Sequence, residues 1–129
     1  MVVFATRFLE VDDLICLGRE MGVQRLRDAG VLVAAVARAR ASLRGEDVYP
    51  SLEAKGTALF QEILTSRPYN RYNRALAWRA LTVFLAMNGR RIDLSGNEVL
   101  RLVDEVSSGD LVSVTRIAGR LPTSSRERS

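Results

Sequence analysis

Arginine and amide side chains gather in one short stretch of the chain, between two apolar segments. Arg67, Arg71 and Arg74 follow one another within eight residues, and Asn73 lies among them. They directly precede or open a predicted helix, whose N-terminus already carries about half a positive charge. Because these charges repel one another, either the guanidinium groups turn into solvent or an anion or acidic partner lies among them. The spacing therefore indicates a candidate anion-binding site.

The amino-acid composition restricts the chemistry that this stretch could perform. The chain has no histidine and one cysteine, Cys16. It therefore cannot build the usual zinc sites, a Ser-His-Asp triad or a Cys-His pair, and we predict no metal ligand set. A general base would have to be a carboxylate, a tyrosine or a bound water. We expect Cys16 to be a small packing residue of a helix.

The stretch leads into the most apolar predicted helix, at about residues 74–88. Between residues 75 and 87 only Arg79 and Thr82 are polar, so neighbouring elements must cover nearly every side of this helix. It is too short to span a membrane. Asn73 is predicted to be its N-cap, and Gly89 its end. We expect this helix to be the centre of the fold.

The rest of the chain predicts an all-α domain of five to six helices. The predicted helices lie at about residues 12–21, 31–41, 52–65, 74–88, 96–106 and 113–121. Ser51 is a predicted N-cap, and Ser95 with Glu98 has the spacing of a capping box. Residues 45–50 predict a short flap, with a strand at Val48 and Tyr49.

Length and charge give the broad class of the protein. The chain has 129 residues, a length that suits one domain, which we expect at residues 1–121. A disordered polar tail is expected at residues 122–129. The net charge is +4. The modest positive charge is weak support for nucleic-acid binding. The N-terminus lacks the pattern of a secretory signal, and we expect a cytoplasmic protein.

Several segments together resemble the Fic/Doc (Fido) superfamily, and within it the death-on-curing (Doc) toxins. The motif of that family is His-x-Phe-x-Asp/Asn-Gly/Ala-Asn-Lys-Arg, and the corresponding run here is Arg67-Pro68-Tyr69-Asn70-Arg71-Tyr72-Asn73-Arg74-Ala75. The helix that follows ends in Phe84-Leu85-Ala86-Met87-Asn88-Gly89, as in the family. Residues 26–32 and 45–55 are similar to its other segments. The resemblance covers about residues 9–120.

The resemblance implies an activity and a set of partners. Members transfer phosphate or AMP from ATP, with Mg²⁺, to a protein hydroxyl, and elongation factor Tu is the target of the Doc branch. A Phd-like antitoxin is the expected partner. By the same resemblance, Asn73 and Arg74 would contact the nucleotide, and Tyr69 would be the buried aromatic anchor of the loop.

The motif here departs from the family at its chemical positions. Arg67 replaces the histidine that acts as general base, and arginine stays protonated at physiological pH. Arg71 replaces the acidic residue that helps to hold Mg²⁺, Tyr72 replaces a small residue that lets backbone approach phosphate, and Ala75 replaces a phosphate-binding arginine. The sequence thus predicts a preserved scaffold with a degenerate site.

Three hypotheses follow from these residues. In the first, the protein is a catalytically impaired pseudoenzyme that binds an acidic antitoxin helix, a nucleotide or another protein. In the second, it is a working transferase that neutralises phosphates with arginines and takes its base from the flap or the preceding helix. That hypothesis uses Arg67, Arg71, Arg74 and Arg79, with Glu46, Asp47 or Glu62 as base and Tyr49 in the flap. In the third, the same arginines bind nucleic acid.

Overall fold

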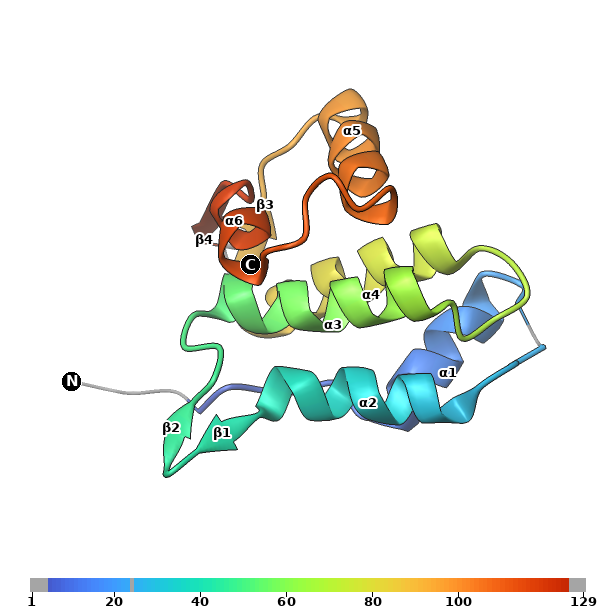
Figure 1. Cartoon of the computed structure of the whole chain (residues 1–129), viewed down its shortest axis with the longest axis horizontal. Helices are drawn as coiled ribbons and strands as arrows, with labels where there is room; N and C mark the ends of the chain where they lie inside the picture. The colour runs from blue at the N-terminus through green and yellow to red at the C-terminus, as the bar shows by residue number, and fades with distance from the viewer. Residues whose placement is uncertain (1–4, 24, 126–129) are drawn as a thin grey trace.

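The computed structural model of the chain describes residues 5–23 and 25–125. Within these residues it has six α-helices and two antiparallel ribbons of two strands each (Figure 1). The helices are α1 (Val11–Glu20), α2 (Ala29–Arg40), α3 (Leu52–Ser66), α4 (Asn73–Met87), α5 (Gly96–Ser107) and α6 (Val114–Gly119). The strands are β1 (Ser42–Leu43), β2 (Glu46–Asp47), β3 (Arg90–Ile92) and β4 (Thr123–Ser125). The expected helical domain is confirmed. No helix in the described ranges is both long and apolar enough to cross a bilayer.

Helices α3 and α4 run antiparallel through the middle of the molecule (Figure 1). Helix α2 packs on one side of α3, and α5 and α6 pack on the other side. The helix predicted at 74–88 therefore lies at the centre, but it shares this place with α3, which is the more enclosed of the two. Trp78, Thr82 and Val83 of α4 stay half-buried. The prediction that other elements cover nearly every side of this helix was wrong, because the described residues leave this face of α4 partly open.

Local capping signals gave most helix starts correctly. The Ser51 hydroxyl accepts from the Ala54 amide at 3.0 Å, and Ser95 and Glu98 form the predicted capping box. Helix α1 begins one residue earlier than expected, because Glu10 is its N-cap and forms a capping box with Asp13. Asp13 therefore caps from inside the first turn.

Two further predictions concern Cys16 in α1 and the residues that precede this helix. Cys16 is exposed, so it is not a packing residue of α1. The sequence also predicts a short lead-in segment over residues 4–11; residue 4 lies outside the described residues, and residues 5–10 have no regular secondary structure.

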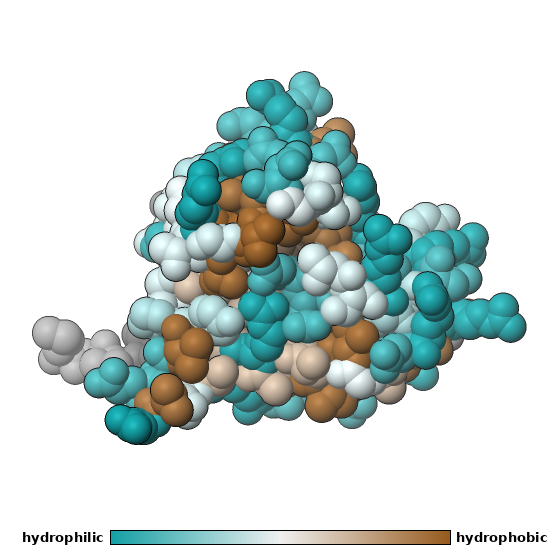
Figure 2. Space-filling model, viewed as in Figure 1, coloured by the Kyte–Doolittle hydropathy of each residue, from teal (hydrophilic) through white to brown (hydrophobic). Residues whose placement is uncertain are grey.

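The predicted flap is a small hairpin formed by β1 and β2, in which Leu43 pairs with Glu46. Its strand lies at Glu46–Asp47 instead of Val48–Tyr49. Arg44 and Gly45 both have positive φ, 54° and 82°, which is the backbone of a tight two-residue hairpin turn. Figure 2 shows apolar side chains over this hairpin, at the lower left, where Leu43 is 70% exposed.

The C-terminal segment is ordered further than the sequence predicted. Residues 123–125 form β4, which pairs with β3, so the prediction of a disordered tail was wrong for this part; residues 126–129 lie outside the described residues. The Thr123 hydroxyl donates to the Glu53 carboxylate of α3 at 2.7 Å, and it accepts from the Arg90 guanidinium at 2.7 Å. These contacts attach the segment to the body of the domain.

Candidate functional site

The loop of residues 67–72 joins α3 to α4 and has a left-handed residue at each end. Arg67, the C-cap of α3, has φ 48°, and Tyr72, which directly precedes α4, has φ 63°. A side chain at such a φ costs about 1–2 kcal/mol per residue, because Cβ crowds the following carbonyl. The rest of the structure must therefore hold this loop in its shape.

Hydrogen bonds to two neighbouring segments hold the loop. The Asn73 side chain accepts from the Tyr69 amide at 3.0 Å and donates to the Tyr69 carbonyl at 2.9 Å. The Pro68 carbonyl accepts from the amides of Arg27 and Asp28 at 2.7 and 3.2 Å. The prediction that Asn73 caps α4 was wrong, because its amide group is occupied in bracing the loop. It is the first residue of the helix, and Tyr72 is the N-cap.

A cavity of about 530 Å³ opens where this loop enters α4. Its lining residues are Arg27, Leu64, Arg67, Asn70, Tyr72, Asn73, Arg74, Ala75 and Ser107. This set contains three arginines and no carboxylate. Together with the N-terminus of α4, the cavity is a positively charged site of the kind that attracts anions. We call it the arginine cavity.

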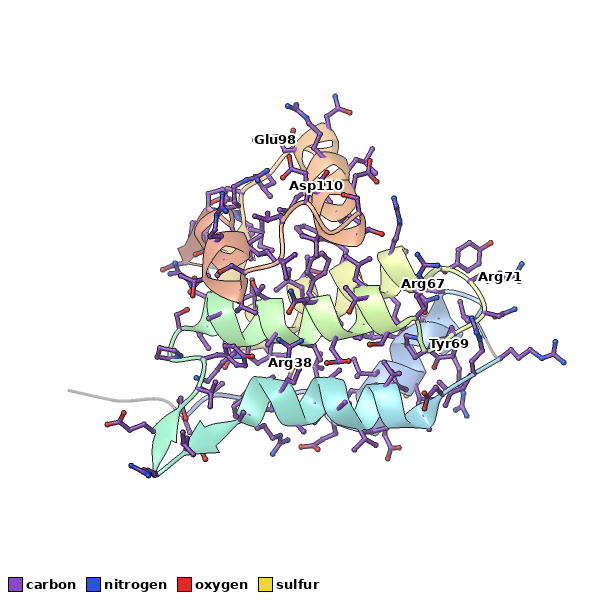
Figure 3. The ribbon with its side chains drawn as sticks, in the orientation of Figure 1. Arg38, Arg67, Tyr69, Arg71, Glu98 and Asp110 are labelled. Atoms are coloured by element: carbon purple, nitrogen blue, oxygen red, sulfur yellow. The ribbon has the colours of Figure 1, made fainter. Side chains whose placement is uncertain are left out.

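The predicted arginines take different places around this cavity. Arg67 lines it, and Arg74 lines it while its guanidinium also contacts the carboxylate of Asp104 on α5. Because that ion pair is exposed, it neutralises Arg74 only in part. Arg71 does not line the cavity, and its guanidinium lies 5.0 Å from the centre of the Tyr72 ring. Figure 3 shows Arg67 and Arg71 at the loop end of the α3–α4 pair.

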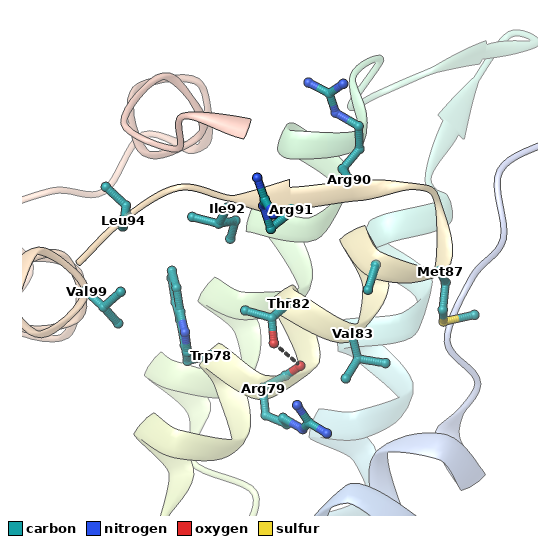
Figure 4. A pocket seen from close by; sticks show the side chains of 11 residues that line it. Trp78, Arg79, Thr82, Val83, Met87, Arg90, Arg91, Ile92, Leu94 and Val99 are labelled. Atoms are coloured by element: carbon teal, nitrogen blue, oxygen red, sulfur yellow. Dashed lines mark hydrogen bonds between the residues drawn. The ribbon is translucent and has the colours of Figure 1, made fainter. Parts of the chain in front are cut away.

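Arg79 does not join this cluster. It lies five residues after Arg74, which is about 140° around a helix, so it projects from another face of α4. There it lines a second cavity of about 710 Å³ together with Trp78, Arg90 and Arg91. In Figure 4 the Arg79 side chain points away from Arg90 and Arg91. The proposed role of Arg79 beside the other loop arginines has no support in this geometry.

The flap residues lie at the opposite end of α3 from the loop (Figure 1). Since α3 has 15 residues, its ends are separated by about 22 Å. Asp47 accepts from the buried Lys55 at 2.8 Å, and the Tyr49 hydroxyl accepts from Arg38 at 3.1 Å. Glu46 lies in the exposed hairpin. The described structure does not bring these three residues to the arginine cavity.

Glu62, the remaining carboxylate proposed as a base, is also engaged elsewhere. It lies 3.4 Å from the Arg38 guanidinium and accepts from the Ser66 hydroxyl at 2.8 Å. Within the described residues, no three Asp, Glu, Cys or His side chains gather as a metal site. The arginine cavity can therefore neutralise and orient an anion, but its lining residues offer no carboxylate that would accept a proton from a substrate hydroxyl. Tyr72 is the one lining side chain of another kind that can act as a base.

Sequence reasoning missed two polar residues of this cavity, Arg27 and Ser107. Arg27 reaches it because residues 26–28 pair with the loop, with an isolated bridge between Leu26 and Tyr69. The sequence did place residues 26–32 in the family pattern, but nothing local indicates that this segment meets residue 68. No sequence pattern indicates that Ser107, at the end of α5, lines the cavity.

Comparison with known proteins adds an independent result. No family model matches the chain. The chain is 34% identical, over 109 residues, to a curated protein named Toxin Doc from Mycolicibacterium smegmatis. The aligned region covers 81% of this chain and 84% of that relative. Since this identity extends over most of both chains, the protein belongs to the Doc toxin family.

Proposed function

We propose that this protein is the toxin-family component of a toxin–antitoxin pair and acts by binding instead of group transfer. The observation that carries the proposal is the lining of the arginine cavity, which has three guanidinium groups and no carboxylate. A transferase of this family would need a base and a metal ligand there. Here the position of the base is Arg67, which lines the cavity, and the position of the metal ligand is Arg71, which lies outside the lining against the Tyr72 ring.

Mg²⁺ does not fit the donor groups of this cavity. Magnesium in phosphoryl-transfer sites is held by one or two carboxylates and by substrate phosphates. The lining offers the amides of Asn70 and Asn73 among guanidinium groups, which repel a cation. ATP could bind there only through its phosphates, and we expect such binding to occur without turnover.

The partner that suits the cavity best is an acidic segment of a Phd-like antitoxin. Carboxylates of such a segment would pair with Arg27 and Arg67, which have no ion-pair partner among the described residues. Charge-assisted bonds between arginine and carboxylate are about twice as strong as neutral ones. A modification of elongation factor Tu is not part of this proposal, because it would require the missing base.

Label transfer tests the proposal directly. The purified protein would be incubated with bacterial extract, Mg²⁺ and ATP labelled at the α or the γ phosphate. We expect no labelled band from the natural chain, and a band from the Arg67→His, Arg71→Asp variant, which restores the base and the metal ligand of the family motif. A labelled band from the natural chain would refute the loss of transfer.

Binding is tested with a matched pair of arginine variants. Antitoxin co-purification and titration with fluorescent ATP would be compared for Arg27→Gln, inside the cavity, and Arg79→Gln, outside it. We expect the first to weaken both and the second to change neither. Equal behaviour of the two variants would mean that the cavity is not the binding site. Retention of nucleic acid that falls steeply with salt would favour the third hypothesis instead.

A further inference from the structure

A separate cavity of about 510 Å³ lies between α1, the segment after it and the loop of residues 67–72. It is lined by Ile15, Arg19, Val23, Leu26 and Tyr69. Three of these side chains are aliphatic, one is a cation and one has a phenolic hydroxyl. The volume lies within the range of about 300–1,000 Å³ that is typical of small-molecule sites. We call it the α1 pocket.

The polar group inside this pocket is the hydroxyl of Tyr69. The Tyr69 side chain is only 2% exposed, and its hydroxyl makes no hydrogen bond with any other described residue. Gly18 makes room for the hydroxyl, since an ideal Cβ there would lie 2.9 Å from the phenolic oxygen. This oxygen has no protein partner in the described part of the chain but is not wholly enclosed, so it remains accessible from the pocket, where a ligand can reach it.

Arg19 supplies a charge at the same pocket. Its side chain is exposed, and it forms no ion pair among the described residues. Burial raises the pKa of the Tyr69 phenol, and the nearby positive charge of Arg19 acts in the opposite direction. Both side chains line the same pocket, so one anionic group inside it can meet the guanidinium and the phenol.

We propose that the α1 pocket binds a small apolar monocarboxylate. Its carboxylate accepts from Arg19 and from the hydroxyl of Tyr69, and its hydrocarbon part covers the aliphatic wall. A singly charged group matches the single cation, and the wall of Ile15, Val23 and Leu26 disfavours a more polar ligand such as free phosphate. This site is distinct from the arginine cavity, and its existence does not depend on the function proposed above.

A ligand in the α1 pocket would restrain the loop of residues 67–72. The backbone of Tyr69 is bound on both sides by the Asn73 side chain, and that of Pro68 is bound by the amide of Arg27, which lines the arginine cavity. A ligand that fixes the Tyr69 ring therefore restrains the same loop that shapes the cavity. The carboxylate is in this sense a regulatory ligand.

Titration with phenylacetate as the probe tests the site, followed by NMR of the labelled full-length chain. We expect saturable shifts of the amides of residues 15, 19, 23, 26 and 69, and at least tenfold weaker binding of the uncharged isostere phenylacetamide. Arg19→Gln should weaken phenylacetate binding about tenfold, whereas Arg25→Gln, which removes an exposed charge outside the pocket lining, should leave it unchanged. Absence of saturable shifts up to about 10 mM, or equal affinity for the amide, would overturn the proposal.

Tyr69→Phe gives a second test that does not depend on the probe's affinity alone. The variant removes only the hydroxyl, and we expect it to unfold at an equal or higher temperature than the natural chain when no ligand is present. It should also lose the rise in unfolding temperature that phenylacetate gives to the natural chain. If the variant is less stable without ligand, the hydroxyl already has a partner inside the protein and the proposed site is wrong.

Discussion

Gly56 lets α3 and α4 approach closely, and replacing it with alanine should destabilise the fold. An ideal Cβ at this position would lie 2.6 Å from Leu81 Cδ1 and 3.2 Å from Phe84 Cδ2. Both side chains are fully buried, so neither can turn into solvent. Because carbon atoms in contact are normally about 3.5–4.0 Å apart, the first contact is about 1 Å too short.

The expected size of the effect follows from two opposing terms. Overpacking of a core costs about 1–3 kcal/mol, and this contact belongs at the upper end of that range. Alanine is favoured over glycine inside a helix by about 1 kcal/mol, which offsets part of the cost. The free energy of unfolding of Gly56→Ala should therefore fall by about 1–2 kcal/mol, which lowers Tm by about 4–10 °C for a domain of this size.

Urea unfolding followed by circular dichroism measures this change, with Gly96→Ala as the matched control. Gly96 opens α5, and an added Cβ there meets no atom of the described residues within 4 Å, so the control should be unchanged or slightly more stable. In the double variant Gly56→Ala, Leu81→Ala the loss should be smaller than the sum of the single losses, because the second change removes the clash. If Gly56→Ala is as stable as the natural chain, the close approach of α3 and α4 is wrong.

Three other measurements probe the loop, the open face of α4 and the C-terminal segment. Tyr72→Gly should be about 1 kcal/mol more stable than Tyr72→Ala in thermal unfolding, since only glycine relieves the left-handed backbone. Trp78→Ala should lower the free energy of unfolding in urea by about 2–3 kcal/mol. This loss is smaller than that expected for a fully buried tryptophan, because Trp78 is half-buried and packs edge-on against Phe60 with the ring centroids 6.0 Å apart. Burial raises the pKa of Glu53, but hydrogen bonds, that from Thr123 first, outweigh this and hold the pKa below its ordinary value. The ionised carboxylate of Glu53 therefore stabilises the fold above the unfolded-state pKa of about 4.3, and this stabilisation is lost as the pH falls through the lower folded-state pKa. The difference in the free energy of unfolding between the natural chain and Glu53→Gln should accordingly shrink between about pH 6 and pH 3.

The helices could be predicted from the sequence because their signals are local. Ser51 and the pair Ser95 and Glu98 start helices through hydrogen bonds that span three residues. The stop at Gly89, with φ 76°, is equally local, since glycine adopts this conformation without strain. Such features depend on a few consecutive residues and need no knowledge of the tertiary fold.

The candidate site could be predicted only in part, because its composition depends on long-range packing. Spacing alone placed Arg79 with Arg74, although they lie on different faces of α4. The hypothesis of a working transferase took Asp47 of the flap as a base for the loop, although the length of α3 separates them. Arg27 was missed because its approach depends on pairing with Pro68. The order at Thr123 depends on a glutamate 70 residues away, which no local pattern reveals.

The strained loop is an argument that the arginine cavity has a role in binding. Arg67 and Tyr72 are held left-handed without the glycine that would relieve them, at a combined cost of about 2–4 kcal/mol. That is a large share of the 5–15 kcal/mol that stabilises an ordinary domain. Asn73 nevertheless commits its whole side chain to holding this shape. A loop that served only to connect α3 to α4 could relax and recover this free energy. Its retained shape is therefore best explained by a ligand or partner that the cavity must fit.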